Sequence, residues 1–162
     1  MGYHKVTEQI KGLLTQSGIW FETFEHESVR TSEEAAKVRP RYSLKQGAKA
    51  IIIRVKAGRV KYFAMLTMPA DTRFDNDKVQ GVFRAKDIRF ASEAEVKEIT
   101  GGVEPGGVPP FGNLFGLKVV ADPSLFENEK IVFNAGDRSF SLAMNSKDYR
   151  ELVKPEIESI IE

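Results

Sequence analysis

Cysteine is absent from the 162-residue sequence, and histidine occurs only twice, at His4 and His26. The lack of cysteine excludes disulfides, thiolate zinc sites and cysteine nucleophiles. Neither histidine lies in a metal-ligand spacing, so carboxylates would have to supply most ligands of a zinc or iron site, and no metal is expected. A Ser-His-Asp triad would have to use one of these two histidines. Walker, dinucleotide-binding and G-x-S-x-G motifs are also lacking, and no cofactor is expected.

Long hydrophobic runs are lacking as well. No segment reaches the roughly 20 apolar residues that span a membrane, and no signal peptide opens the sequence. A membrane partner is therefore not expected, and the cytoplasm is the expected location. The composition, 41% hydrophobic and 29% charged, is typical of a globular protein. The length suits one domain over residues 1–162.

Net charge is nearly absent, at +1, which argues against a general nucleic-acid coat. The distribution is uneven, because residues 30–61 hold ten basic residues and only two acidic ones, whereas residues 122–162 hold nine acidic and five basic ones. This asymmetry suggests a positive face directed at an anionic partner. A solvated face without a partner is the alternative.

Periodicity and capping signals predict the elements. An amphipathic helix is expected over 3–17, and capping boxes at 31–34 and 92–95 predict two further helices. A short helix is expected over 75–83 and a last one from Ser146, kinked or restarted at Pro155. Strands are expected over 19–24, 50–55, 60–68, 88–90, 116–121, 130–135 and 139–144. Together they predict a single α+β domain with a mixed, largely antiparallel, barrel-like sheet and surrounding helices.

A loop over 100–112 contains five glycines and three prolines. Glycine permits close backbone approach and proline restricts φ, so the loop combines a defined shape with exposed amides. Such a wall suits a polar ligand or a developing oxyanion. A plain structural crossover between two strands is the alternative.

Several motifs then occur together. They are His26, Thr31-Ser32-Glu33-Glu34-Ala35-Ala36, Gln46-Gly47-Ala48-Lys49-Ala50-Ile51, Ala70-Asp71-Thr72-Arg73-Phe74-Asp75, Thr100-Gly101 and Gly106-Gly107-Val108-Pro109-Pro110-Phe111-Gly112. In this order and spacing, the chain resembles the YbaK/EbsC-type aminoacyl-tRNA deacylases, whose superfamily includes the editing domain of bacterial prolyl-tRNA synthetases. The resemblance covers roughly residues 26–152. A lysine before an apolar strand, combined with a later Gly-x-x-x-Pro loop, is its most specific part.

The resemblance implies a trans-editing hydrolase that cleaves the ester between a wrong amino acid and tRNA. Its partners would be aminoacyl-tRNA and, as a further candidate, an aminoacyl-tRNA synthetase. An aminoacyl ester is already activated, so a positioned water with oxyanion stabilisation suffices without a strong protein nucleophile. The alternative is a non-catalytic module of the same fold that binds tRNA or a synthetase.

The resemblance also assigns site residues. The catalytic group would be Lys49 with the backbone at Gly106 and Gly107. Substrate-binding residues would be Phe24, His26, Val108, Pro109, Pro110, Asn134, Gly136 and Ser141. The basic excess of residues 30–61, taken together with a tRNA substrate, makes Arg30, Arg39, Arg41 and Lys45 the expected tRNA-binding residues. Phe24, Asn134 and Ser141 stand where tyrosine, serine and aspartate are frequent, so cysteinyl, alanyl and seryl esters all remain open.

Each assignment has a simpler alternative. Lys49 could be an ordinary charged residue at a strand entrance, and His26 could be a loop histidine with satisfied hydrogen bonds. Asp71, Arg73 and Asp75 fit a structural turn network best.

Overall fold

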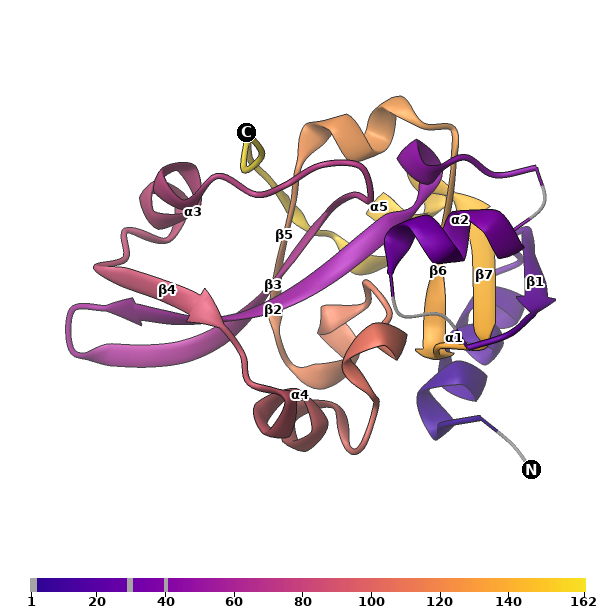
Figure 1. Cartoon of the computed structure of the whole chain (residues 1–162), viewed down its shortest axis with the longest axis horizontal. Coiled ribbons are helices and arrows are strands. Elements are labelled where there is room, and N and C mark those ends of the chain that lie inside the picture. The colour runs from indigo at the N-terminus through magenta and orange to yellow at the C-terminus, as the bar shows by residue number, and fades with distance from the viewer. Residues whose placement is uncertain (1–2, 29–30, 40) are drawn as a thin grey trace.

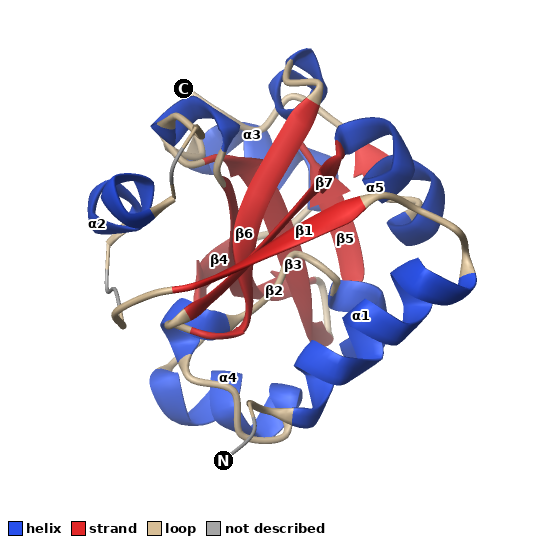
Figure 2. Cartoon of the chain, turned by 90° about the vertical axis from the view of Figure 1, so that its right-hand side faces the viewer, coloured by secondary structure: helices blue, strands red, loops and turns tan. Residues whose placement is uncertain are grey.

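Two twisted sheets form the centre of the fold, which a computed structural model describes for residues 3–28, 31–39 and 41–162 (Figure 1). Helices surround the strands (Figure 2). The elements in chain order are α1 (Lys5–Gln16), β1 (Phe21–Glu25), α2 (Ser32–Val38), β2 (Ala48–Ala57), β3 (Val60–Pro69), α3 (Asn76–Phe83), β4 (Asp87–Phe90), α4 (Glu93–Thr100), β5 (Lys118–Ala121), β6 (Lys130–Asp137), β7 (Phe140–Asn145), α5 (Ser146–Val153) and β8 (Glu156–Ile157).

The first sheet has the order β1-β7-β6 and is antiparallel throughout. The second has the order β4-β2-β3-β5-β8, in which β3 pairs with β5, and β5 with β8, in parallel. A bridge between Gly47 and Val132 joins the two sheets. The α+β prediction is confirmed, but the barrel-like closure is wrong. The sheets stay separate because the chain leaves β3, β5 and β7 through helices and loops instead of continuing one ladder.

Two apolar clusters support the sheets. Val6, Ile10 and Leu14, on one face of α1, are buried with side chains of β6 and β7. On the second sheet, Val79 and Phe83 of α3 are buried with side chains of β2 and β3. The i, i+4 spacing that predicted α1 therefore produces the packing that stabilises it.

The predicted helix boundaries follow their capping residues. The Thr31 and Ser92 side chains accept hydrogen bonds from the amides of Glu34 and Glu95, as N-cap residues should. The last helix ends at Val153, before Pro155, and the chain then adds β8 to the sheet. The expected kink or restart is wrong, because the residues after Pro155 are extended.

The Gly/Pro loop folds into two short 3₁₀ helices, Pro105–Gly107 and Gly112–Phe115. Its middle is held by Tyr149 of α5, which is fully buried and donates a hydrogen bond of 2.6 Å to the Pro110 carbonyl. Because a buried hydroxyl must find a partner, this bond fixes the loop against α5.

Among the helices of the described residues, none combines the length and apolar character that crossing the lipid bilayer requires.

Gly136 lies in the β6 bulge with φ +103°, and a Cβ there would overlap the Thr7 hydroxyl of α1. We expect Gly136→Ala to lower the free energy of unfolding by about 2 kcal/mol or more, because both the backbone and the contact oppose a side chain. Denaturant unfolding measures the change. The matched control is Gly81→Ala in α3, where a Cβ has nothing within 4 Å. It should stabilise by about 0.5–1 kcal/mol. Equal effects of the two variants would contradict the packing described.

Candidate active site

A cavity of about 140 Å³ opens between α2, the start of β2, the turn after β3, the Gly/Pro loop and β6. Six of the lining residues carry the chemistry and shape discussed below: Arg39, Gly47, Lys49, Ala70, Gly106 and Asn134. Parts of the chain almost 100 residues apart therefore meet at one small, polar site.

Lys49 is the second residue of β2, so the strand determines where its side chain begins. Its Nζ donates a hydrogen bond to the Thr72 carbonyl in the turn after β3. Burial lowers the pKa of Lys49, an effect that the carboxylates of Glu33 and Asp71 oppose and that Arg73 reinforces. Lys49 is thus a half-buried ammonium held at the cavity wall.

Asn134 and Ser141 face each other across β6 and β7. The Arg39 guanidinium donates to both, from Nε to Ser141 Oγ and from Nη2 to Asn134 Oδ1, each at 2.9 Å. Asn134 Nδ2 donates in turn to the Gly106 carbonyl at 2.7 Å. We call Arg39, Asn134 and Ser141 the polar wall, and Asn134 connects this wall to the loop.

Arg39 is only 7% exposed, and it forms no ion pair with a carboxylate of the described chain. Desolvation lowers the pKa of Arg39 to about 10. This position corrects the expectation that Arg39 lies on an exposed tRNA-binding face. The three-dimensional packing of α2 turns the side chain inward, where neutral oxygens accept its hydrogens.

His26 extends the polar wall from the end of β1. Its Nδ1 lies 2.7 Å from the Glu27 carbonyl and its Nε2 lies 2.7 Å from Ser141 Oγ. Because a carbonyl only accepts, Nδ1 carries a proton and donates it to the Glu27 carbonyl. Ser141 Oγ also lies 3.1 Å from Asn134 Oδ1. The Ser–His pair has the form of an activated nucleophile, but Ser141 is fully buried, so a substrate carbonyl has no access to it.

Within the Gly/Pro loop, the Gly107 amide donates to the Glu104 carbonyl at 2.8 Å. A Cβ at Gly107 would lie 3.0 Å from the Asp137 amide, so close packing on β6 accounts for this glycine. The Val108 amide has a longer contact, 3.5 Å, to the Pro105 carbonyl. The oxyanion role expected of the Gly107 amide stays a prediction, and the amide would have to leave this acceptor to perform it.

Comparison with known proteins identifies the family of this chain. The family model of the aminoacyl-tRNA editing domain matches residues 26–152. The chain belongs to the aminoacyl-tRNA editing family. The expected class, a hydrolase acting on aminoacyl-tRNA, is thereby confirmed at the level of the family.

Individual relatives agree with this assignment. The chain is 36% identical over 159 residues to the multifunctional Ser/Thr-tRNA deacylase ProXp-y of Escherichia coli K12, covering 97% of this chain and 94% of that protein. It is 29% identical over 118 residues to the proline–tRNA ligase of Stenotrophomonas maltophilia R551-3, covering 73% of this chain and 20% of the ligase. A solved structure of a candidate trans-editing enzyme for prolyl tRNA synthetase shares the fold, with TM-score 0.81 and 22% identity over 99% of both chains.

The other residues that the family resemblance assigned to substrate take different places. Val108 lines the cavity, and Phe24 lies on the sheet face that carries Ser141, edge-to-face with Tyr42 at 5.8 Å. Pro109 and Pro110 are buried residues of the loop itself, and they do not line the cavity. Gly136 lies against α1, also outside the lining.

Of the four cations assigned to tRNA, the three within the described residues do not form one exposed surface. Arg39 is buried, and Arg30 lies outside the described residues. Arg41 pairs with Glu22 at 3.2 Å, and Lys45 with Glu127 at 3.8 Å. A tRNA role for the latter two stays a prediction.

Two small residues of the cavity had no predicted role. A Cβ at Gly47 would lie 2.9 Å from Ala70 Cβ, so both residues must be small for β2 and the turn after β3 to meet. Both lie within motifs that carry the family resemblance, and that was the available signal. Asp75, in contrast, has the structural role expected, because it caps α3. Among the described residues, no three His, Asp or Glu side chains cluster as metal ligands.

Lys49→Met should leave the melting temperature at neutral pH unchanged or raised, because it removes a half-buried charge and water can replace the bond to Thr72. The lowered pKa means that the unfolded chain binds the proton more tightly than the folded one. The stability contribution of Lys49 therefore becomes more favourable as the pH rises toward its ordinary pKa of 10.5. Thermal melts from neutral to alkaline pH should show the variant's advantage shrinking. An advantage that grows with pH would contradict the assigned desolvation.

Proposed function

We propose that the chain is a trans-editing deacylase that hydrolyses the ester of tRNA mischarged with a small amino acid, preferentially one with a side-chain hydroxyl. One observation carries the proposal: the lining of the small cavity contains an ammonium, Lys49, and two members of the polar wall, Arg39 and Asn134, beside the loop backbone at Gly106. These are the groups that an aminoacyl ester, already activated, needs for positioning.

Lys49 anchors the terminal ribose or its phosphate in this proposal. Its bond to the Thr72 carbonyl uses one of three ammonium hydrogens, so two remain for ligand oxygens. A point charge suits this task, because the donors of lysine rotate to meet either a phosphate or a vicinal hydroxyl. The anchored ribose then holds the ester carbonyl beside the loop.

Water is the nucleophile in this scheme, because Ser141 is buried and His26 is fully engaged with Ser141 and the Glu27 carbonyl. The water oxygen attacks the ester carbon, and the negative charge that develops on the carbonyl oxygen is stabilised by loop amides. The Gly106 amide is the first candidate, because the Gly107 amide donates to the Glu104 carbonyl at 2.8 Å and the Val108 amide has a longer contact of 3.5 Å with the Pro105 carbonyl. The C–O bond to the ribose breaks, the ribose oxygen takes the proton, and free amino acid and tRNA leave.

Selectivity comes from size and polarity. A cavity of about 140 Å³ has room for a small side chain. Hydrogens of Arg39 that the polar wall does not use are donors for a hydroxyl, and a buried donor left unpaired by an apolar side chain costs binding energy. Seryl and threonyl esters should therefore be cleaved better than alanyl ones. The name of the Escherichia coli relative, a Ser/Thr-tRNA deacylase, agrees with this preference.

The non-catalytic alternative uses the same cavity to hold charged tRNA without hydrolysis. An aminoacyl-tRNA synthetase remains a proposed partner, because part of a proline–tRNA ligase is similar to this chain. Turnover of a mischarged tRNA by purified protein separates the two functions.

Lys49→Ala should lower the single-turnover rate of deacylation about 10²–10³-fold, the cost of losing one electrostatic anchor. Lys49→Arg should rescue only in part, because a planar fork does not occupy the position of an ammonium. Mischarged seryl-tRNA is the substrate, and Lys147→Ala on the exposed face of α5 is the control. Undiminished hydrolysis by folded Lys49→Ala protein would remove this lysine from the mechanism.

Arg39→Met should lower the preference for seryl over alanyl ester by about 10–100-fold, the usual range for one buried hydrogen bond of about 1–3 kcal/mol. The readout is the ratio of kcat/KM for the two substrates, which is independent of the fraction of folded protein. Arg39→Lys, which keeps the charge but not the fork, should recover part of the preference. An unchanged ratio in both variants would show that the polar wall does not select the side chain.

A further inference from the structure

The far end of the β2–β3 hairpin projects away from the sheet of β1, β6 and β7, with β4 beside it (Figure 1). This end of the hairpin, the segment before β4 and β4 itself hold seven cations. Residues 54–61 and 84–90, which contain them, include only one acid, Asp87. We call these seven the basic arm: Arg54, Lys56, Arg59, Lys61, Arg84, Lys86 and Arg89. A chain with net charge +1 thus gathers a strong local excess on one projection.

Strand register places like charges opposite one another on the basic arm. Lys56 faces Lys61 across β2 and β3, and Arg54 faces Arg89 across β2 and β4, although Asp87 lies opposite Lys56 on its other side. Like charges directly opposite destabilise a sheet, so this arrangement works against folding. An anionic partner would relieve the repulsion.

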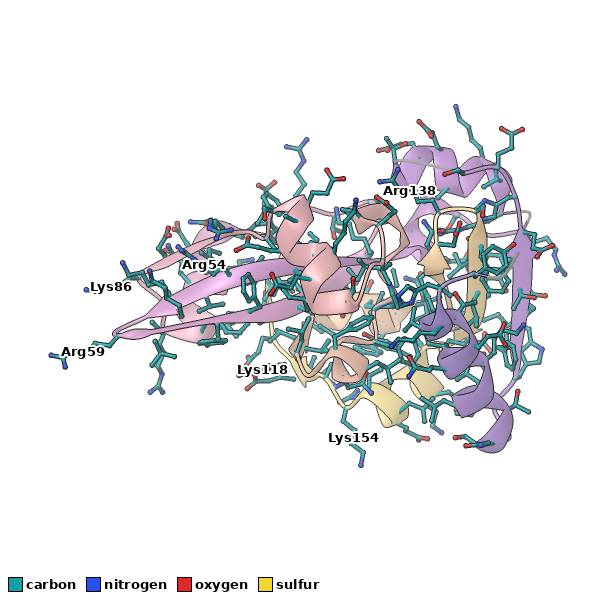
Figure 3. All side chains as sticks on the ribbon, turned by 90° about the horizontal axis from the view of Figure 1, so that it is seen from below. Arg54, Arg59, Lys86, Lys118, Arg138 and Lys154 are labelled. Atoms are coloured by element: carbon teal, nitrogen blue, oxygen red, sulfur yellow. The ribbon has the colours of Figure 1, made fainter. Side chains whose placement is uncertain are left out.

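Only two cations of the basic arm form ion pairs within the described chain. Arg54 pairs with Asp87 at 3.2 Å and Arg89 with Glu95 at 2.8 Å. Arg59, Lys61 and Lys86 are exposed and have no carboxylate within ion-pair distance in those residues. Figure 3 shows Arg59 at the tip and Lys86 and Arg54 near it, whereas Lys118 and Lys154 project from another part of the surface.

The arm is continuous with the cavity through β2. Lys49 lines the cavity, and eight residues of strand lead from it to Ala57 at the turn, about 26 Å at roughly 3.3 Å per residue. A tRNA whose charged 3′ end reaches Lys49 continues from its unpaired nucleotides into a duplex, and that duplex presents phosphates over such a distance. Exposed large apolar side chains on the arm are limited to Val60 and Phe90. Charge, not apolar contact, is therefore its means of recognition.

We propose that the basic arm binds the phosphate backbone of the tRNA whose aminoacyl end enters the Lys49 cavity. The proposal rests on the proposed function and adds the location of the tRNA surface. The hairpin, and not the buried Arg39, carries this surface, while Arg41 and Lys45 stay predicted contacts. Phosphate binding releases counterions, so affinity should fall steeply as salt increases.

The test compares two triple variants that remove the same charge. R59Q/K61Q/K86Q changes the basic arm, and K5Q/K147Q/K154Q changes three lysines outside it. Binding of uncharged tRNA is measured over a salt series, and deacylation of mischarged tRNA gives kcat and KM. For the arm variant we expect a Kd and a KM raised about 10–100-fold, a log–log salt slope smaller by about 2, and an unchanged kcat. The control should bind and react as the wild type does.

A loss of folding stability cannot account for weaker tRNA binding by the arm variant. Removal of Lys61 relieves its repulsion with Lys56, so the arm variant should melt no lower than the wild type while binding tRNA more weakly. Equal loss in the two variants, or wild-type affinity of the arm variant, would overturn the proposal. So would an arm that binds vesicles of anionic lipid but not tRNA.

The two proposals fail separately. Wild-type protein that binds uncharged tRNA through the arm but releases no amino acid would disprove the deacylase and leave the arm in place. Efficient deacylation with wild-type kinetics in the arm variant would disprove tRNA binding by the basic arm and leave the deacylase function in place.

Discussion

The burial of the Arg39 guanidinium against neutral oxygens is the constraint on which the site depends. A charge taken out of water is costly unless hydrogen bonds replace its hydration, and here Ser141 and Asn134 supply them. These bonds hold α2 against β6 and β7, and Asn134 passes the constraint to the Gly106 carbonyl. An ion pair with a carboxylate would stabilise the guanidinium more, but it would consume the hydrogens that a ligand needs. The arrangement gives up this stability and leaves guanidinium hydrogens for the ligand that the proposed function places in the cavity.

Small residues determine how near the elements come to one another. Gly47 and Ala70 let the entrance of β2 approach the turn after β3, and Gly107 lets the loop rest on the backbone of β6. Lys49 is consequently held by strand pairing on one side and by the Thr72 carbonyl on the other. Half of the twelve residues that line the cavity are glycine or alanine, so its walls carry few bulky side chains.

Local patterns predicted the local structure well. Cap residues such as Thr31 and Ser92 and the hairpin turn at Gly58 act within a few residues, so the sequence reveals them directly. The separation into two sheets and the short β8 depend on pairings between distant segments, which no window of sequence contains. The same distinction applies to the site. Lys49 and the loop belong to recognisable motifs, whereas the burial of Arg39 follows from contacts about 100 residues away, and its basic neighbours suggested a surface instead.

The Ser141 hydroxyl lies within hydrogen-bond distance of His26 Nε2, Arg39 Nε and Asn134 Oδ1. The Asn134 oxygen has two lone pairs, so it accepts from Arg39 and from Ser141 at the same time. Imidazole, hydroxyl, amide and guanidinium therefore form one connected network, in which each hydrogen bond polarises the next. A substitution at any one of the four residues should disturb the other three, so the energetic effects of substitutions within the network should not be additive.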